Sequence, residues 1–257
     1  MDPLITIEAL GDNFIYLYQY SSSSALVVDP SDSSSVLQII EKRKLNLSMI
    51  LVTHHHWDHT AGVAKLKSKT GCRIVGGDKQ RILGIDIVAD DGQILTVGDA
   101  KMQVITTPGH TRTSVCYYME PSSDNGRGIL WTGDTLFVGG CGRLLECSPQ
   151  VMWNSLQKLV SLPEATRLYC GHDYAMENYE FALSIEPDNQ VIKKCLQQVK
   201  QTQKAGKGTV PSTILQEKIT NPFLRADTPE IKNALNMPQA STVEVFGQLR
   251  RRKDAFY

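Results

Sequence analysis

Residues that can bind metal ions occur at four separate points of this chain, and each group directly follows a short apolar segment. The seven candidate ligands are His54, His56, Asp58, His59, His110, Asp134 and His172. The preceding apolar segments, which predict buried strands, are residues 49–52, 102–106, 129–131 and 167–169. Ligands on loops after several strands can converge at one edge of a sheet. The pattern therefore predicts an α/β fold with a metal site at that edge.

The spacing within residues 53–59 assigns different roles to neighbouring histidines. In an extended segment, side chains two residues apart point the same way, so His54 and His56 face one ion and His55 faces away. We expect His55 to pack or to hydrogen-bond rather than to bind metal. Asp58 and His59 begin a helical pattern over residues 58–66, which aims both back at the same edge.

The number and chemistry of these ligands indicate two ions rather than one. A lone Gly-His or Gly-Asp after a strand is usually a polar turn, but four groups in compatible positions favour metal binding. Five histidines and two aspartates exceed the needs of one tetrahedral ion and suit two ions that share a carboxylate. Without a thiolate among them, the ligands fit zinc and also admit iron or manganese. We therefore expect two divalent ions per chain, with zinc as the first choice of metal.

Composition and charge exclude several classes of protein. The chain has 257 residues and a formal net charge of zero, which argues against nucleic-acid or membrane-surface binding. No apolar run approaches the ~20 residues of a membrane span, and the N-terminus lacks the basic and apolar regions of a signal peptide. We expect a cytoplasmic monomer, with a longer organelle-targeted form left open. Six cysteines without Cys-x-x-Cys spacing are expected to be free thiols.

The predicted secondary structure changes near residue 174, from mostly strands to helices. Before it, strand patterns are expected at residues 4–10, 13–20, 25–28, 73–75, 94–97, 102–106 and 114–119. Ser33, Ser34 and Ser35 offer N-caps for a helix through residue 45, and Asp29-Pro30 begins a loop that could approach the metal edge. After it, helices are expected at residues 176–185, 191–205 and 242–253, with a short one beginning at Thr228-Pro229. Residues 1–174 carry 15 basic against 18 acidic residues, whereas residues 175–257 carry 12 against 9. A weakly basic second part suits a small acidic substrate.

The order His-x-His-x-Asp-His, a lone His, Gly-Asp and a final Gly-His resembles the metallo-β-lactamase superfamily. Along essentially its whole length the chain resembles glyoxalase II, the hydroxyacylglutathione hydrolases. The stretches that carry this resemblance are residues 53–62, 132–137, 140–143, 169–174, 221–225 and 249–254. The resemblance implies an α/β (α+β) fold: an αββα sandwich over residues 1–174, followed by a smaller helical substrate-binding domain over residues 175–257.

The resemblance also implies an activity and a division of the ligands. The family hydrolyses S-(2-hydroxyacyl)glutathione thioesters, such as S-D-lactoylglutathione to D-lactate and glutathione, the second step of methylglyoxal detoxification. The first ion is expected to take His54, His56 and His110, the second Asp58, His59 and His172, with Asp134 between them. Asp58 and Asp134 are the catalytic candidates. Two dications that bind the same bridging water lower its pKa from ~15.7 to about 7. The hydroxide that results is the expected nucleophile.

Substrate recognition is expected from basic residues and a tyrosine. By resemblance, the glutathione carboxylates are bound by Arg143, Tyr174, Arg250 and Lys253, with Asn178 as a weaker candidate. Arg250 and Lys253 are three residues apart and share one helix face, whereas Arg251 and Arg252 turn elsewhere. The family usually carries an aromatic residue where this chain has Leu145. This departure bears on substrate affinity and on the preferred thiol carrier.

The chemistry of a thioester agrees with what the chain offers. Its thiolate leaving group has a conjugate acid of pKa ~8.5, so it departs without a dedicated general acid. There is no Gly-x-Ser-x-Gly motif, and Cys141 in a glycine-rich stretch is expected to form a backbone turn rather than a nucleophile. The alternatives are a single-iron persulfide dioxygenase or another thioester hydrolase of the superfamily, a nuclease of this fold, and a non-catalytic scaffold. The helical tail, the neutral charge and the complete ligand set argue against the dioxygenase, the nuclease and the scaffold respectively.

Overall fold

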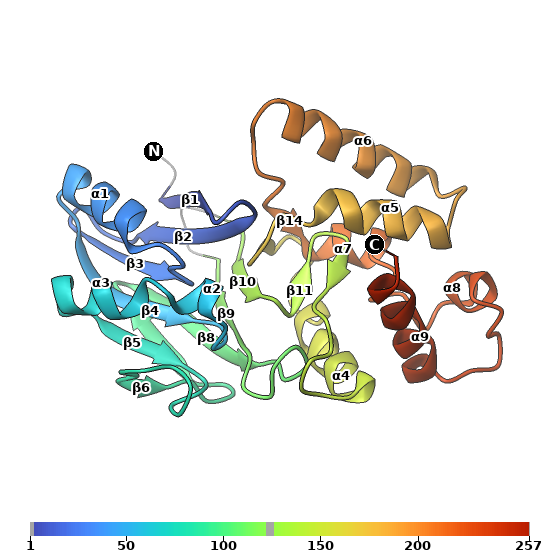
Figure 1. Cartoon of the computed structure of the whole chain (residues 1–257), viewed down its shortest axis with the longest axis horizontal. Coiled ribbons are helices and arrows are strands. Elements are labelled where there is room, and N and C mark those ends of the chain that lie inside the picture. The colour runs from blue at the N-terminus through green and yellow to red at the C-terminus, as the bar shows by residue number, and fades with distance from the viewer. Residues whose placement is uncertain (1–2, 122–125, 257) are drawn as a thin grey trace.

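Two six-stranded sheets form the centre of the computed structural model, which describes residues 3–121 and 126–256 (Figure 1). The first sheet has the strand order β1-β2-β3-β4-β5-β6. Its strands are β1 (Leu4–Ala9), β2 (Asn13–Gln19), β3 (Ser24–Val28), β4 (Asn46–Val52), β5 (Arg73–Gly76) and β6 (Ile87–Val88). The second sheet has the order β14-β13-β10-β9-β8-β7. Its strands are β7 (Ile94–Val97), β8 (Ala100–Thr106), β9 (Val115–Met119), β10 (Ile129–Gly133), β13 (Arg167–Cys170) and β14 (Ser212–Thr213).

Alternation along the strands builds three apolar layers. In β2, Tyr16 packs into the core between the two sheets, whereas Ile15 and Leu17 pack on the opposite face of the first sheet. That outer face is covered by α1 (Ser33–Arg43) and α3 (Val63–Thr70). The outer face of the second sheet packs against α4 (Pro149–Val160) and the C-terminal helices. Because successive strand residues point to opposite faces, these strands can serve two cores at once. The predicted αββα sandwich is confirmed.

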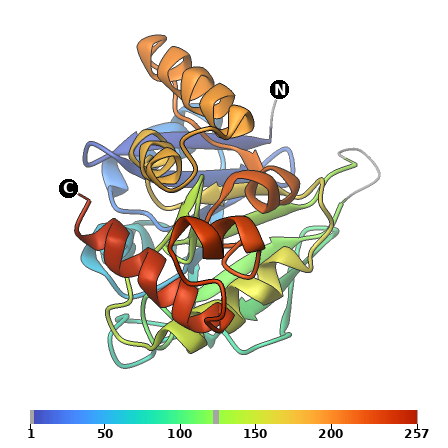
Figure 2. The same ribbon diagram turned by 90° about the vertical axis from the view of Figure 1, so that its right-hand side faces the viewer.

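The chain after residue 174 is helical, as predicted. Its helices are α5 (Ala175–Ile185), α6 (Gln190–Lys204), α7 (Ile214–Thr220), α8 (Pro229–Ala234) and α9 (Thr242–Asp254). They lie together on one side of the second sheet (Figure 2), and they share a continuous apolar core with β10, β13 and α4. The division of the chain into two domains at residue 174 stays a prediction. Within the described residues, no helix combines the length and apolar character needed to cross a membrane.

The N-cap of α1 differs from the predicted one. The predicted N-cap residues Ser33, Ser34 and Ser35 lie inside the helix, and the N-cap is Asp32. The Asp32 carboxylate accepts hydrogen bonds from the backbone amides of Ser34 at 3.1 Å and Ser35 at 2.8 Å. Asp32 therefore satisfies two of the first free amides of the helix, which no single serine hydroxyl does.

The prediction of one continuous helix over residues 58–66 is wrong. The structure has a short helix α2 (Trp57–Thr60), a break, and then α3. At the break the Gly62 amide donates to the Pro30 carbonyl at 2.8 Å, and a Cβ on Gly62 would lie 2.6 Å from that oxygen. Contact with a distant loop thus interrupts a helical pattern that is continuous in the sequence. The sequence also did not reveal β6, β11 (Leu136–Phe137), β12 (Gly140–Cys141), β14, α4 or α7.

Candidate metal centre

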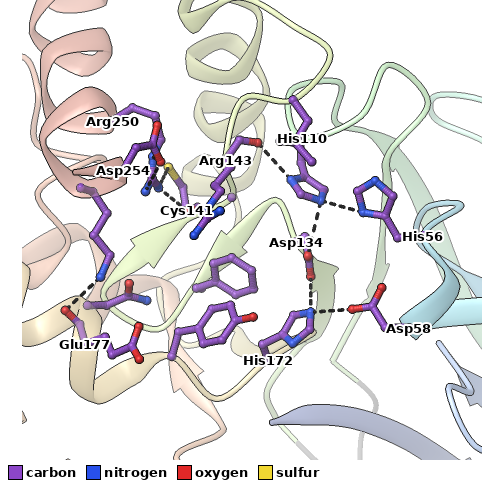
Figure 3. A pocket seen from close by; sticks show the side chains of 16 residues that line it. His56, Asp58, His110, Asp134, Cys141, Arg143, His172, Glu177, Arg250 and Asp254 are labelled. Carbon is purple, nitrogen blue, oxygen red and sulfur yellow. Dashed lines mark hydrogen bonds and ion pairs between the residues drawn. The ribbon is translucent and has the colours of Figure 1, made fainter. Parts of the chain in front are cut away.

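Four chain segments bring the seven predicted ligands to one edge of the sandwich. Figure 3 shows those that line the cavity, which are His56, Asp58, His110, Asp134 and His172. One segment follows β4 and includes α2, and the other three follow β8, β10 and β13. Their side chains form three groups whose ligand atoms lie within 4.8 Å of one another. The groups are His54, His56 and His110; His54, His59 and Asp134; and Asp58, His59 and His172.

The first three histidines converge on one point. Nδ1 of His56 lies 3.0 Å from Nε2 of His54 and 3.1 Å from Nε2 of His110. His54 and His56 therefore face the same side, as the period of an extended segment predicts. Three ring nitrogens at such distances can bind one cation.

A second group lies beside the first. The Oδ2 atom of Asp58 lies 3.3 Å from Nε2 of His172 and 3.7 Å from Nε2 of His59. The two histidine Nε2 atoms are 3.3 Å apart. This group supplies a carboxylate and two imidazoles, which is a ligand set suited to a second divalent ion.

Asp134 lies between the two groups and turns one carboxylate oxygen toward each. Its Oδ2 is 3.5 Å from Nε2 of His110 and 3.9 Å from Nε2 of His54. Its Oδ1 is 3.4 Å from Nε2 of His59 and 3.5 Å from Nε2 of His172. Oδ1 is buried and accepts no hydrogen bond within the described structure. A buried carboxylate oxygen without a donor is costly, so a cation at this point would satisfy it.

Asp29 organises two of the histidines from behind. Its Oδ2 lies 3.0 Å from Nδ1 of His59 and accepts from the Thr53 hydroxyl at 2.6 Å, while its Oδ1 accepts from the Thr53 amide at 2.8 Å. The Thr53 hydroxyl oxygen lies 3.1 Å from Nδ1 of His54. These contacts favour the proton on Nδ1 of both rings, which leaves Nε2 with a lone pair for metal.

Two further acceptors hold the rings of His172 and His110. Nδ1 of His172 lies 2.9 Å from Oδ1 of Asp12, and Nδ1 of His110 lies 3.0 Å from the Arg143 main-chain oxygen. The sequence placed the loop at residue 29 near the metal edge but missed Asp29 and Asp12 as partners of histidine. An acid at the end of a strand was the signal at Asp29, whereas Asp12 in a hairpin turn gave none.

Gly171, which directly precedes the ligand His172, has a steric role. A Cβ on Gly171 would lie 2.5 Å from Oδ1 of Asp134 and 2.7 Å from Cε1 of His59. Real Cβ atoms do not approach that closely, so only glycine lets β13 bring His172 against Asp134. The Gly-His sequence thus reflects close approach of two ligand loops.

Burial and neighbouring charges shift the pKa values of the ligands in different directions. Burial and the neighbouring His59 lower the pKa of His54 well below its ordinary value, which keeps this imidazole neutral. Burial opposes ionisation of Asp58, but its hydrogen bond with His172 and the charge of His59 lower its pKa to about 2. In the same way His59 outweighs burial and holds the pKa of Asp134 well below its usual range. Burial opposes protonation of His59 and His172, but the carboxylates of Asp134, Asp29 and Asp58 raise the pKa of His59 well above its ordinary value and that of His172 to about 10. A cation would therefore displace a proton from each of these two rings to obtain the neutral form that binds metal.

A cavity of about 390 Å³ opens from the metal groups toward the C-terminal helices. His56, Asp58, His110, Asp134 and His172 line it on one side. The same cavity is lined by all of the predicted substrate residues, which are Arg143, Tyr174, Asn178, Arg250 and Lys253. Leu145 also lines the cavity, together with Phe137, Glu177 and Asp254, which the sequence did not single out.

Comparisons with known proteins agree with this architecture. A family model described as the metallo-β-lactamase superfamily matches residues 10–172, and one described as the hydroxyacylglutathione hydrolase C-terminus matches residues 173–256. A hydroxyacylglutathione hydrolase of Methylococcus capsulatus is 41% identical over 256 residues, which cover 98% of each chain. One of Rhodospirillum rubrum is 43% identical over 253 residues, which cover 97% of each chain. The chain belongs to the hydroxyacylglutathione hydrolase family.

Solved structures share the fold at lower identity. ETHE1 from Myxococcus xanthus aligns with a TM-score of 0.68 and 24% identity, over 96% of this chain and 89% of that one. TTHA1623 in a di-iron-bound form aligns with a TM-score of 0.58 and 22% identity, over 86% of this chain and 99% of the other. Together with the histidine-rich cluster, membership of the metallo-β-lactamase superfamily indicates a dinuclear metal site in this hydroxyacylglutathione hydrolase family member.

Within this family member, Arg250 is more constrained than the sequence suggested. Its side chain is buried, Nη1 donates to the Cys141 carbonyl at 2.8 Å and Nε donates to Oδ1 of Asp254 at 3.0 Å. The guanidinium also lies 5.0 Å from the centre of the Phe223 ring. Arg250 therefore builds the cavity wall as well as facing the cavity.

The other predicted cavity residues differ in the contacts that hold their side chains. Asn178 is buried and donates from Nδ2 to the Val138 carbonyl at 3.0 Å. The Tyr174 ring stacks on the His172 ring with centroids 4.9 Å apart. Nζ of Lys253 donates to the Glu177 carbonyl at 3.1 Å. Burial lowers the pKa of Lys253 to about 8, and the nearby charges of Arg250 and Arg143 act in the same direction.

Two residues that were expected to stay out of the chemistry lie in the expected surroundings. His55 belongs to none of the ligand groups, and its Nε2 lies 3.1 Å from Nη1 of Arg81. Cys141 is buried, and burial raises the pKa of its thiol to about 11, so it is no thiolate at neutral pH. All six cysteines are free, as predicted.

Proposed function

We propose that this chain hydrolyses S-(2-hydroxyacyl)glutathione thioesters and converts S-D-lactoylglutathione to D-lactate and glutathione. The observation that carries the proposal is the shared cavity: two ligand groups joined by Asp134 open into the same space as Arg143 and Lys253. The full-length relatives named hydroxyacylglutathione hydrolase support the same substrate class. We assign the seven ligands as predicted, with zinc as the first choice of metal.

The residues present fit two divalent ions, because every ligand is an imidazole or a carboxylate and a buried Asp134 oxygen lacks a donor. When bound, such ions polarise a carbonyl oxygen and make a water acidic enough to act as a nucleophile at neutral pH. The same ligand chemistry accepts iron or manganese.

The protein side chains complete this chemistry by orientation. We assign Asp58, which lines the cavity as a carboxylate, to accept a hydrogen bond from the attacking water and aim it at the carbonyl carbon. Asn13 holds Asp58 in place, since its Nδ2 lies 3.0 Å from the Asp58 carbonyl and 3.3 Å from Oδ2. Burial raises the pKa of the Tyr174 hydroxyl, so it stays protonated and can donate to the substrate.

The leaving group explains why no acid is needed on the carrier side of the cavity. A glutathione thiolate has a conjugate acid of pKa ~8.5 and departs without prior protonation. The cations Arg143 and Lys253 instead meet the carboxylates of the tripeptide. Leu145, which is 57% exposed at the cavity, offers this carrier an apolar surface and no hydroxyl.

A direct assay separates the proposal from its main alternative, a persulfide dioxygenase. The metal-loaded protein should remove the thioester absorbance of S-D-lactoylglutathione with a kcat/KM in the ordinary enzymatic range of about 10⁴–10⁸ M⁻¹s⁻¹. It should consume no oxygen when given glutathione persulfide. Oxygen consumption without thioester hydrolysis would contradict the proposal. The monomeric state and the cytoplasmic location stay predictions.

A further inference from the structure

The β11–β12 hairpin connects the metal centre to the substrate side of the cavity (Figure 3). Asp134 lies just before β11, and Arg143 follows β12. The Arg143 side chain lines the cavity, while its main-chain oxygen lies 3.0 Å from Nδ1 of His110. A displacement of this hairpin would therefore move a metal ligand's hydrogen-bond partner and a substrate cation together.

The turn of the hairpin is tied to the C-terminal helices through its backbone. The Gly139 amide donates to Oε2 of Glu217 at 2.8 Å. Nδ2 of Asn221 donates to the Gly140 carbonyl at 2.9 Å and to the same Glu217 oxygen at 3.0 Å. Two side chains of α7 and its C-cap thus satisfy the amide of one turn residue and the carbonyl of the next.

Both tethering side chains are fully buried and fully engaged. Glu217 and Asn221 have no exposed surface. Oε1 of Glu217 accepts from the Ser212 hydroxyl at 2.6 Å, and Oδ1 of Asn221 accepts from the Phe223 amide at 3.1 Å. Burial raises the pKa of Glu217 to about 7. Because a serine hydroxyl can donate or accept, the acid and the carboxylate can both keep the same contacts.

Steric contacts leave the turn little room to settle elsewhere. Gly139 has a φ of +71°, and a Cβ there would lie 3.1 Å from the Tyr179 ring. A Cβ on Gly140 would lie 2.6 Å from Nδ2 of Asn178. The turn is pressed against α5 while Glu217 and Asn221 hold it from α7, so its position is set from two sides.

We propose that Glu217 and Asn221 are positioning residues that clamp the β11–β12 hairpin, and thereby fix the orientation of His110 and the entry of Arg143 into the cavity. The effect on Arg143 rests on the proposed function, whereas the effect on His110 rests only on the hydrogen bonds. The clamp gives residues 221–225 a role in a cavity that Asn221 itself does not line.

Three variants separate positioning from simple loss of stability. Glu217→Ala removes the acceptor of the Gly139 amide, whereas Glu217→Gln keeps an oxygen for Gly139 and Asn221 and an amide for Ser212. Ile231→Ala is the matched control, because Ile231 is buried in the same helical region but lies in α8, away from the hairpin (Figure 1). Each variant is measured for its melting temperature, for KM with S-D-lactoylglutathione, and for the visible absorption spectrum and affinity of bound cobalt.

Glu217→Ala should weaken cobalt binding by about ten-fold, the lower end of what loss of a ligand's outer partner costs, and should change the cobalt spectrum. It should also raise KM by about five-fold or more, whereas Glu217→Gln should stay within about three-fold of the native protein in both properties. Ile231→Ala should lower the melting temperature without altering KM or the spectrum. If Glu217→Ala does not fold, Asn221→Ala, which keeps the bond between Glu217 and Gly139, should give the same two changes.

The proposal is overturned if Glu217→Ala, or Asn221→Ala in its place, melts earlier but keeps the native KM and cobalt spectrum. A Glu217→Gln protein as impaired as Glu217→Ala would also overturn it. Failure of the native protein to hydrolyse the thioester would instead refute the proposed function. In that case the cobalt affinity and spectrum still decide whether the clamp orients His110.

Discussion

Replacing Asp58 with alanine should lower kcat by about two orders of magnitude or more while KM changes little. The Asp58 carboxylate lies 3.3 Å from Nε2 of His172 and 3.7 Å from Nε2 of His59, so its loss removes one ligand of the second ion. It also removes the group that we assign to orient the water. The cations that meet the carrier are unchanged, so binding of the ground state should survive. Steady-state kinetics and the metal content of the same preparation measure both effects.

A matched carboxylate elsewhere provides the control for this variant. Asp227 is exposed and lies outside the cavity, so Asp227→Ala should leave kcat and metal content unchanged. A near-native kcat for Asp58→Ala would show that the assigned ligand set is wrong. A fall in KM equal to the fall in kcat would instead place Asp58 in ground-state strain, against our assignment.

The double substitution of Arg143 and Lys253 by alanine should raise KM for S-D-lactoylglutathione by about ten-fold or more. Charge-assisted hydrogen bonds to a carboxylate contribute roughly 1.5–3 kcal/mol each, and ten-fold corresponds to about 1.4 kcal/mol. kcat should change less, because neither side chain belongs to a ligand group. Arg250 is left in place because it holds the Cys141 carbonyl, and its removal would disturb the cavity wall. Kinetics at low and high salt measure the effect, which salt should reduce.

The pKa of Lys253 adds a test by pH. Burial lowers this pKa to about 8, so the side chain is a cation below pH 8 and loses its charge as the pH rises through that value. kcat/KM should therefore fall above about pH 8, and Lys253→Arg should remove this fall because a guanidinium stays charged.

The control for the Arg143 and Lys253 double variant is Arg251→Ala with Arg252→Ala, two exposed cations on the same helix as Lys253, which should leave KM unchanged. An unaltered KM in the Arg143 and Lys253 double variant would mean that the carrier is recognised elsewhere.

The parts of this structure that depend on local pattern could be predicted from the sequence. Alternating and apolar runs placed the strands before each ligand group, and the two-residue period placed His54 and His56 on one side. After residue 174, α5, α6 and α9 begin and end close to their expected bounds and α8 begins at its expected proline, since capping and proline are local signals, whereas α7 was missed.

What the sequence could not supply depends on contacts between distant residues. Asp12 is 160 residues from His172, and no local pattern pairs them. The break at Gly62 results from a contact with Pro30. Glu217 lies in a helix where a charged residue ordinarily faces water, yet it is buried because the hairpin turn packs against it.

The most direct test of the two-ion account is a titration of metal-free protein with zinc, in which thioester hydrolysis is followed against the number of ions bound per chain. The account predicts that the rate of S-D-lactoylglutathione hydrolysis rises to a plateau only as the bound metal approaches about two ions per chain. Full activity that saturates at about one ion per chain would contradict it, because one of the two ligand groups would then hold no ion in the active protein.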